Sequence, residues 1–240
     1  MPDKRKHRGA HPDDARLFAE AHQAALRLAV EEYAWLLTRD YADESALKLV
    51  GDRHNLTARQ RLAVWRSACS DQALHRRAQA ETPLSQCVPT RLGIDGYNLL
   101  ITIESALSGG LVLIGRDGCR RDLASIHGTY RKVSETIPAV ELIADHLTQA
   151  GATSIDWYLD QPVSNSGRLK VLMAKLLEAR SLHWNIELPD NPDRKLADYT
   201  GVVASADGWI LDHCRSWVNL AADIIETHIP DAWIVDLRTA

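Results

Sequence analysis

The chain has no long apolar run. No stretch approaches the roughly 20 consecutive apolar residues that a transmembrane helix requires. The N-terminal segment, MPDKRKHRGAHPDD, is charged and lacks the apolar centre of a secretion signal. We therefore expect a soluble, cytoplasmic protein that has no membrane partner.

Several motifs that bind metal or nucleotide are also missing. The four cysteines are far apart and form no CxxC pair, which argues against a structural zinc site. The ten histidines show no HExxH pattern. The loops GxxxxGK[ST] and GxGxxG do not occur, and no Asp-x-Asp follows the first expected strand. These absences argue against a nucleotide hydrolase or a phosphatase. An enzyme of this kind is one of three candidate functions.

What is present is an ordinary globular composition with an uneven charge. The 240 residues are 45% hydrophobic and 25% charged, and the net charge is -4. Residues 1–88 carry 14 Lys and Arg against 12 Asp and Glu, whereas residues 89–240 carry 14 against 20. Between Arg53 and Arg77 there are six arginines and one acid, Asp71. The first part therefore suits a polyanion, and the second part suits a cation.

Residues 1–85 are expected to form a small, basic, all-α domain that binds nucleic acid. Helices are expected from Asp13 to Leu37, after the DES segment at 43–45, and from near Asn55, where TARQ has the form of a capping box. The residues of this third helix expected to face inward are Leu62, Ala63, Trp65 and Ala68. The last two helices resemble a helix-turn-helix. A helical bundle with a solvated basic face fits the pattern at least as well.

Strands and helices alternate after a linker at 80–90. This order predicts an α/β domain over residues 90–240, with a Rossmann-like, mainly parallel sheet covered on both faces. The expected strands are 92–95, 111–115, 153–160, 182–188, 201–205 and 232–237. The expected helices are 97–106, 136–150, 166–180 and 209–227.

Three of these strands end on an aspartate: Asp95, Asp160 and Asp207. In an open α/β sheet, ligands bind outside the carboxyl ends of the strands, so these carboxylates meet if their strands are neighbours. Carboxylates that meet repel one another unless a cation lies between them, and oxygen ligands suit Mg²⁺ or Mn²⁺. The alternative for each acid is that it caps the helix that follows.

Further candidates lie close to these acids in the sequence. Asn98 and Ser205 are placed to orient the carboxylates. The start of the helix after Asp160 presents free N–H groups to an anion, reinforced by nearby side chains; its candidates for phosphate binding are Ser166, Arg168 and Lys170.

The segment GRDGCRRDLASIHGTYRK and the segment PDNPDRKLAD add charged candidates. Arg121 and Arg131 are candidates for phosphate contacts, although an exposed charged hairpin explains them as well. Asp122 is a candidate for the metal site. The second segment offers Asp193 and Asp198 as a further acid, and Asp198 is preferred.

These motifs together resemble the PIN and NYN nuclease superfamily. The strand that ends in IDGYN matches the Asp-Gly-x-Asn motif at Asp95, Gly96 and Asn98, and SAD at 205–207 matches the later Ser-x-Asp motif. The resemblance covers residues 90–240 and implies a PIN-like fold whose clustered acids bind Mg²⁺ or Mn²⁺ and hydrolyse phosphodiesters, usually RNA. The chain departs from the pattern after the late motif, where Gly208 and Trp209 replace the usual acid or phenylalanine.

The expected function is therefore a metal-dependent ribonuclease. The alternative is a nucleic-acid-binding or regulatory protein that has the same fold and no catalysis. A homodimer is compatible with the sequence. The expected catalytic residues are Asp95, Asp160, Asp207, Asn98 and Ser205. The expected metal ligands are Asp95, Asp160, Asp207, Asp122 and Asp198. The expected contacts to nucleic acid are Arg59, Arg61, Arg66, Arg121, Arg131, Ser166, Arg168 and Lys170.

Overall fold

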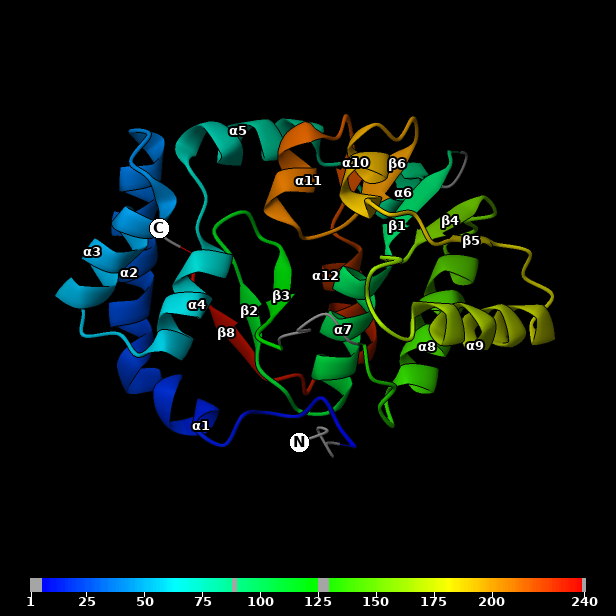
Figure 1. Ribbon diagram of the computed structural model, residues 1–240, viewed down its shortest axis with the longest axis horizontal. Helices are drawn as coiled ribbons and strands as arrows, with labels where there is room; N and C mark the ends of the chain where they lie inside the picture. The colour runs from blue at the N-terminus through cyan, green and yellow to red at the C-terminus, as the bar shows by residue number, and fades with distance from the viewer. Residues whose placement is uncertain (1–5, 88–89, 125–129, 239–240) are drawn as a thin grey trace.

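A computed structural model describes residues 6–87, 90–124 and 130–238. It contains a five-stranded sheet, a second sheet of three strands and a helical N-terminal region (Figure 1). This arrangement confirms the predicted α/β fold with a mainly parallel sheet after a run of helices. Residues 88–89 of the expected linker lie outside the described residues.

The five-stranded sheet is parallel throughout. Its order is β5-β4-β1-β6-β7, and every neighbouring pair is parallel. The strands are β1 Leu92–Asp95, β4 Ile155–Tyr158, β5 Asn185–Glu187, β6 Val202–Ala204 and β7 Trp217–Val218. From β1 the chain builds outward through β4 to β5, and then returns to the other side of β1 to form β6 and β7. The sheet therefore has a topological switch point between β1 and β6.

Burial on both faces explains the apolar residues of the central strand β6, whereas the edge strand β5 carries the polar residues Asn185 and Glu187. On β6, Val202 and Ala204 pack into the largest apolar cluster, whereas Val203 packs into a separate cluster on the other face. The first face is covered by α7 Gly96–Leu107, α8 Thr136–Gln149, α9 Ser166–Ala179 and α12 Leu220–His228. The second face is covered by α10 Pro192–Ala197 and α11 Gly208–His213.

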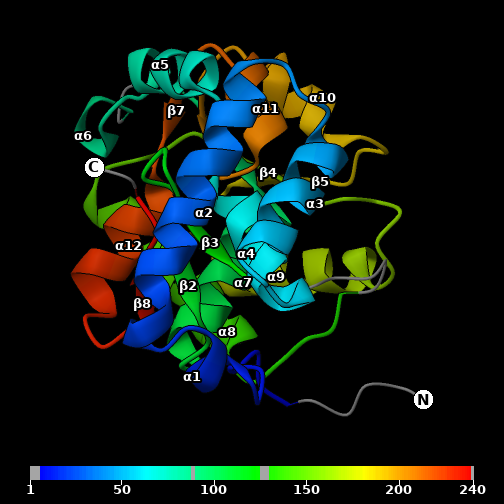
Figure 2. The same ribbon diagram turned by 90° about the vertical axis from the view of Figure 1, so that its left-hand side faces the viewer.

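The second sheet joins the N-terminal helices to the rest of the molecule. Its strands are β2 Val112–Ile114, β3 Arg120–Asp122 and β8 Ile234–Asp236, in the order β3-β2-β8. The helices are α1 Asp14–Leu17, α2 Glu20–Thr38, α3 Asp43–Arg53, α4 Ala58–Ser67, α5 Asp71–Ala80 and α6 Leu84–Cys87. Leu113 and Val235 of this sheet share one apolar cluster with α2 and α4, and Figure 2 shows α2 in front of the sheet. The expected helical region and the α/β region therefore have a common core.

Local signals in the helical region are partly confirmed. Thr57 and Gln60 form the expected capping box at the start of α4. The single helix expected from Asp13 to Leu37 is two helices, because Ala19 adopts an extended ψ of 152° between them. Asn55 adopts a positive φ of 51° between α3 and α4, so the chain cannot continue α3 as a helix through this residue.

The helix expected over 209–227 is wrong as a single element. The chain forms α11, then the edge strand β7, and then α12. Trp217 is fully buried, and its Nε1 donates a hydrogen bond of 2.8 Å to the carbonyl oxygen of Arg77. The parallel pairing of Trp217 with Val203 outweighs the local helical preference. In the part of the chain that the structure describes, no helix combines the length and apolar character that crossing a bilayer requires.

Candidate functional site

The candidate site lies at the switch point between β1 and β6. Asp95 is the last residue of β1, and Ser205 follows directly after β6. Because the connections leave these two strands toward opposite sides, a crevice forms where their carboxyl ends meet. Asp95 and the Ser205–Asp207 segment face each other there.

Hydrogen bonds fix the segment after β6 against the start of α7. The Ser205 hydroxyl donates to Oδ2 of Asp95 at 2.7 Å, and the backbone N–H of Asp207 donates to the Ser205 hydroxyl at 3.0 Å. The N–H of Ala206 donates to Oδ1 of Asn98 at 2.9 Å. Ser205 therefore lies where it can orient the Asp95 carboxylate, as the sequence predicted, whereas the Asn98 side chain holds the backbone after β6 and contacts no carboxylate.

Asp95 and Asp207 use their carboxylates differently. Asp207 caps α11, because its Oδ1 accepts hydrogen bonds from the N–H groups of Trp209 and Ile210 at 2.9 and 3.1 Å. Asp95 occupies the N-cap position of α7, but its side chain makes no capping hydrogen bond. Helix capping therefore explains the aspartate at 207 in part. At 95 the helix contributes less: the backbone N–H of Asn98 favours the ionised carboxylate, without the geometry of a capping hydrogen bond.

Gly96 lets the chain turn tightly beside Asp95. A Cβ atom at this position would lie 2.5 Å from Cδ2 of Leu159 and 2.8 Å from the carbonyl oxygen of Tyr158. Any side chain would push β1 and β4 apart, so the glycine after Asp95 is required by the close approach of the two strands.

Negative charge at this edge helps to raise the pKa of Asp95 and that of Asp193. Burial raises the pKa of Asp95 to about 7; the Ser205 hydrogen bond opposes the rise, and the charges of Asp207 and Asp193 add to it. Burial and the charges of Asp207 and Asp160 raise the pKa of Asp193. A cation at this edge would relieve the repulsion and favour the ionised carboxylates.

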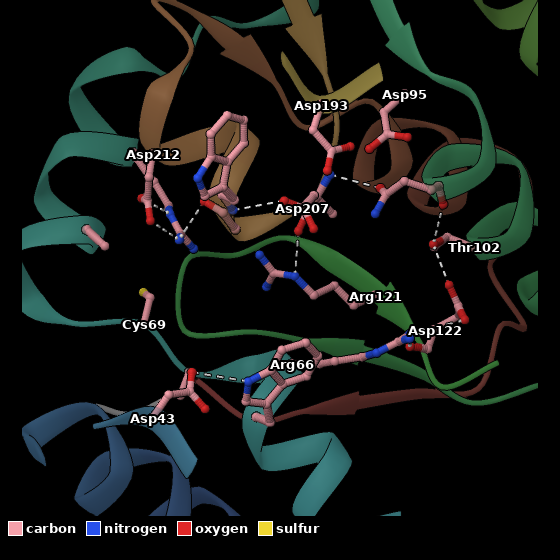
Figure 3. Close-up of a pocket in the computed structure, with 18 of the residues that line it drawn as sticks. Asp43, Arg66, Cys69, Asp95, Thr102, Arg121, Asp122, Asp193, Asp207 and Asp212 are labelled. Carbon is pink, nitrogen blue, oxygen red and sulfur yellow. Dashed lines mark hydrogen bonds and ion pairs between the residues drawn. The ribbon is translucent and has the colours of Figure 1, made fainter. Parts of the chain in front are cut away.

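A cleft of about 760 Å³ opens beside these acids. Asp95, Asp193 and Asp207 lie on one side of it in Figure 3, with Arg121 and Arg66 facing them. Its lining comes from the end of the parallel sheet, from the hairpin of β2 and β3, and from the N-terminal helices. Charged, amide and tryptophan side chains of the lining include Asp43, Trp65, Arg66, Asp95, Asn98, Arg121, Asp122, Asp193, Asp207 and Trp209.

A buried ion-pair cluster supports the cleft from below. Arg121 donates two hydrogen bonds of 2.7 Å to Asp117 and one of 2.8 Å, through Nε, to the carbonyl oxygen of Ala206. Arg77 contacts Asp117 at 2.6 Å and Asp212 at 2.8 Å. Burial alone would raise the pKa of Asp117, but the charges of Arg121 and Arg77 outweigh it and hold that pKa below its usual range. Arg121 is therefore a support for the segment after β6, and its charge is already paired.

Asp122 lies in the cleft, but its carboxylate is occupied. It accepts hydrogen bonds from the N–H of Ala124 at 2.7 Å and from the Thr102 hydroxyl at 3.1 Å. Arg66 donates to the carbonyl oxygen of Asp122 at 2.5 Å and lies 3.4 Å from its carboxylate. Asp122 therefore holds Arg66 at the cleft and is not placed beside Asp95 as a metal ligand.

The other two expected metal ligands lie outside the cleft lining. Asp160 follows β4 as predicted, but burial alone raises its pKa, and it does not line the cleft with Asp95 and Asp207. Asp198 is exposed and lines a separate hollow with Arg91 and Tyr199. Asp193 takes the place for which Asp198 was preferred, because α10 turns Asp193 into the cleft lining.

Three of the residues expected to bind nucleic acid are engaged within the fold. Arg59 pairs with the buried Asp14, and Arg61 pairs with Asp52 at 2.7 Å. Ser166 is buried, and its hydroxyl lies 2.6 Å from the carbonyl oxygen of Asp160 and from the Tyr97 hydroxyl. The expected contacts that lie away from the cleft lining are Arg59, Arg61, Arg131, Ser166, Arg168 and Lys170. Arg66 and Arg121 are the two that reach it.

The sequence prediction for Trp65 is wrong. It was expected to face inward, but it is 47% exposed and lines the cleft. The buried stripe of α4 follows Gln60, Ala63, Val64 and Ser67. One residue advances a helix by about 100°, so Trp65 lies beyond the edge of that stripe.

The acidic side chains of this site limit the ways in which Mg²⁺ or Mn²⁺ could be held. Among residues 6–87, 90–124 and 130–238, no three His, Cys, Asp or Glu side chains are grouped closely enough to hold a metal ion by themselves. Mg²⁺ is usually held by one or two carboxylates with water and substrate phosphates, rather than by a cage of protein ligands. Asp95 and Asp207 supply two carboxylates whose charges already act on each other. The residues therefore fit a hydrated ion shared with a phosphate, and they do not fit a metal held by the protein alone.

Comparison with known families divides the chain at the cleft. The family described as "Domain of unknown function (DUF5616)" matches residues 84–223. The chain belongs to this family. The DUF5616 region contains Asp95, Asp193 and Asp207. A second family, described as "Protein of unknown function (DUF434)", matches residues 25–79, which contain Trp65 and Arg66. The cleft therefore lies between segments that two different family descriptions cover.

The relative from Methanocaldococcus jannaschii described as "Uncharacterized protein MJ0935" is 26% identical over 204 residues. The match covers 84% of this chain and 97% of the relative, so it extends over both the DUF434 and the DUF5616 segments. No solved structure matches the chain.

Proposed function

We propose that this protein is a metal-dependent nuclease that hydrolyses phosphodiester bonds, with RNA as its substrate. One observation carries the proposal: the half-buried carboxylate of Asp95 at the end of β1, whose pKa is raised to about 7, is oriented by Ser205 and lies in the electrostatic field of Asp207 and Asp193. The motifs IDGYN and SAD, which resemble those of the PIN and NYN nucleases, are the segments that meet there.

Asp95 and Asp207 are the residues we propose to hold Mg²⁺ or Mn²⁺, with Asp193 in reach of the surrounding water. When bound, the ion polarises the scissile phosphate and lowers the pKa of an attacking water. Ser205 keeps the Asp95 carboxylate in one orientation through its 2.7 Å hydrogen bond. Arg66 offers a positive charge to the phosphate from the α4 side of the cleft, since its side chain is 26% exposed and lines the cleft while its guanidinium lies 3.4 Å from the Asp122 carboxylate.

A second candidate is a protein that binds nucleic acid without cutting it. The observation that favours it is the absence, among the described residues, of a group of three metal-ligating side chains. In this alternative, the acidic side chains orient the bound nucleic-acid strand and Arg66, and no phosphodiester is broken.

Incubation of the purified full chain with labelled single-stranded RNA and DNA separates the two candidates. The nuclease proposal predicts cleavage of RNA in Mn²⁺ or Mg²⁺ and none in EDTA. Binding that persists in EDTA, with no cleavage in either metal, would favour the second candidate. A phosphomonoester substrate in the same buffers tests for a phosphatase, and its hydrolysis in the absence of RNA cleavage would contradict both.

A further inference from the structure

Two exposed tryptophans line the same cleft. Trp65 on α4 is 47% exposed and Trp209 on α11 is 46% exposed, and both belong to the lining that contains Asp95 and Asp207. Tryptophan is among the more buried residue types on average. Two half-exposed indoles at one cleft, contributed by the N-terminal helices and by the α/β region, indicate a surface that receives a flat ligand.

Each indole is held by a contact that leaves ring area exposed. Trp209 stacks on the His213 ring with 4.3 Å between centroids and 24° between planes. The Nε1 of Trp65 donates a hydrogen bond of 3.3 Å to Oδ2 of Asp43, which also lines the cleft (Figure 3). The rings are therefore oriented before any ligand arrives, which lowers the entropy lost on binding.

Charge alone does not make this cleft attractive to a polyanion. Arg121 and Arg77 are paired with Asp117, and Arg77 is also paired with Asp212. Asp95, Asp193 and Asp207 add negative charge to the same lining. A nucleic acid held here needs a source of affinity other than phosphate contacts, and stacking of bases on aromatic rings supplies one.

We infer that Trp65 and Trp209 are stacking platforms for unpaired bases of a single-stranded nucleic acid. The inference rests on the proposed function and extends it, because it names the substrate as single-stranded. Bases within a duplex already stack on each other and cannot cover a protein ring without being unpaired. Arg66 and Asp95 line the same cleft as the two indoles, so a strand bound there shares the cleft with the proposed metal site.

The test is binding of a labelled oligouridylate in EDTA, where no metal-dependent cleavage occurs. Trp65→Leu and Trp209→Leu keep an apolar side chain but remove the ring, and each is expected to weaken binding about tenfold. Trp65→Phe and Trp209→Phe keep a ring and are expected to recover part of the loss. The matched control is Trp35→Leu, since Trp35 is 52% exposed and does not line the cleft. Its ring is also held by a neighbour, because the guanidinium carbon of Arg39 lies 3.6 Å from the ring centroid.

Melting temperatures check that every variant is folded. Because the three tryptophans are about half exposed, the substitutions are expected to leave the melting temperatures unchanged. Equal binding by the two leucine variants and the Trp35→Leu control would overturn the inference. Binding of a duplex or of free uridine monophosphate as tight as that of the oligonucleotide would also overturn it.

The binding result is independent of the cleavage result. If the leucine variants lose binding and the wild type cuts no RNA in Mn²⁺, the stacking platforms stand and the nuclease proposal fails. If the wild type cuts RNA and the leucine variants bind and cut as it does, the nuclease proposal stands and the stacking inference fails.

Discussion

The Ser205 hydroxyl donates a 2.7 Å hydrogen bond to the Asp95 carboxylate across the boundary between β6 and β1. These residues are 110 positions apart in the chain. The bond joins the two strand ends at which the sheet changes direction, and it opposes the rise in the Asp95 pKa that burial causes. Whether Asp95 is ionised near neutral pH therefore depends on Ser205.

Removal of the Ser205 hydroxyl is predicted to shift the pH dependence of cleavage upward. In Ser205→Ala, Asp95 loses the hydrogen bond that favours its ionised form, so its pKa rises above about 7. A pH–rate profile in Mg²⁺ measures the shift. Ser205→Thr keeps a hydroxyl and is expected to restore the wild-type profile, whereas identical profiles for the alanine variant and wild type would contradict the role of the bond.

Asp95 is predicted to make the metal-free protein less stable as pH rises. Its pKa is about 4 in an unfolded chain and is raised to about 7 in the fold, so the folded state binds the proton more tightly between these values. The free energy of unfolding of wild type is therefore expected to fall relative to that of Asp95→Asn between pH 4 and 7. Chemical denaturation in EDTA at several pH values measures the difference, and a difference that does not change with pH would contradict the prediction.

The Asp117 cluster is predicted to be essential for stability. Asp117→Asn removes the charge that two buried guanidinium groups, Arg77 and Arg121, share. Arg77 keeps its ion pair with Asp212, but the buried Arg121 is left without a charged partner, which costs about 3–5 kcal/mol. Urea denaturation measures the loss. Asp52→Asn, which breaks the exposed pair with Arg61, is the control expected to leave the midpoint unchanged, and equal midpoints for the two variants would refute the prediction.

Arg66 is predicted to contact phosphate where Arg61 does not. Arg66→Gln removes a cation that lines the cleft, so binding of single-stranded RNA should weaken and its salt dependence should become shallower by about one phosphate contact. Arg61→Gln is the matched control, because Arg61 belongs to the same helix and is equally exposed and ion-paired but does not line the cleft. Affinity is measured over a series of salt concentrations, and the same slope for both variants would show that Arg66 is not a phosphate contact.

The sequence was sufficient to predict the alternating architecture and the strand-end position of Asp95. Its limit was the order of the strands, which depends on packing between distant segments. The aspartate pattern predicted three acids together, but α10 turns Asp193 into the cleft, while Asp160 lies outside its lining. Asp193 and Asp198 differ by only five positions, and the sequence alone does not tell which side of a six-residue helix faces the cleft.

The paired arginines were equally hard to predict. Arg77 and Arg121 meet at Asp117 because the β2–β3 hairpin packs under α5, and no local pattern encodes that contact. A signal for Trp209 was present in the sequence, since it follows the SAD motif at the point where the chain departs from the nuclease pattern. The helical stripe of α4 contained the signal for Trp65, which falls outside the positions 60, 63, 64 and 67.

Asp95→Asn provides the most direct test of a metal-dependent site at the end of β1. Asparagine keeps the size of the side chain but removes the charge that would hold the cation, and Asp198→Asn is the control outside the cleft. The decisive measurement is RNA cleavage in Mn²⁺ together with the Mn²⁺-induced rise in melting temperature, made on wild type and both variants. We expect wild type and Asp198→Asn to show both effects and Asp95→Asn to lose both while remaining folded. Cleavage by Asp95→Asn at the wild-type rate, or a wild type that neither cuts RNA nor gains stability from Mn²⁺, would contradict the proposed metal site.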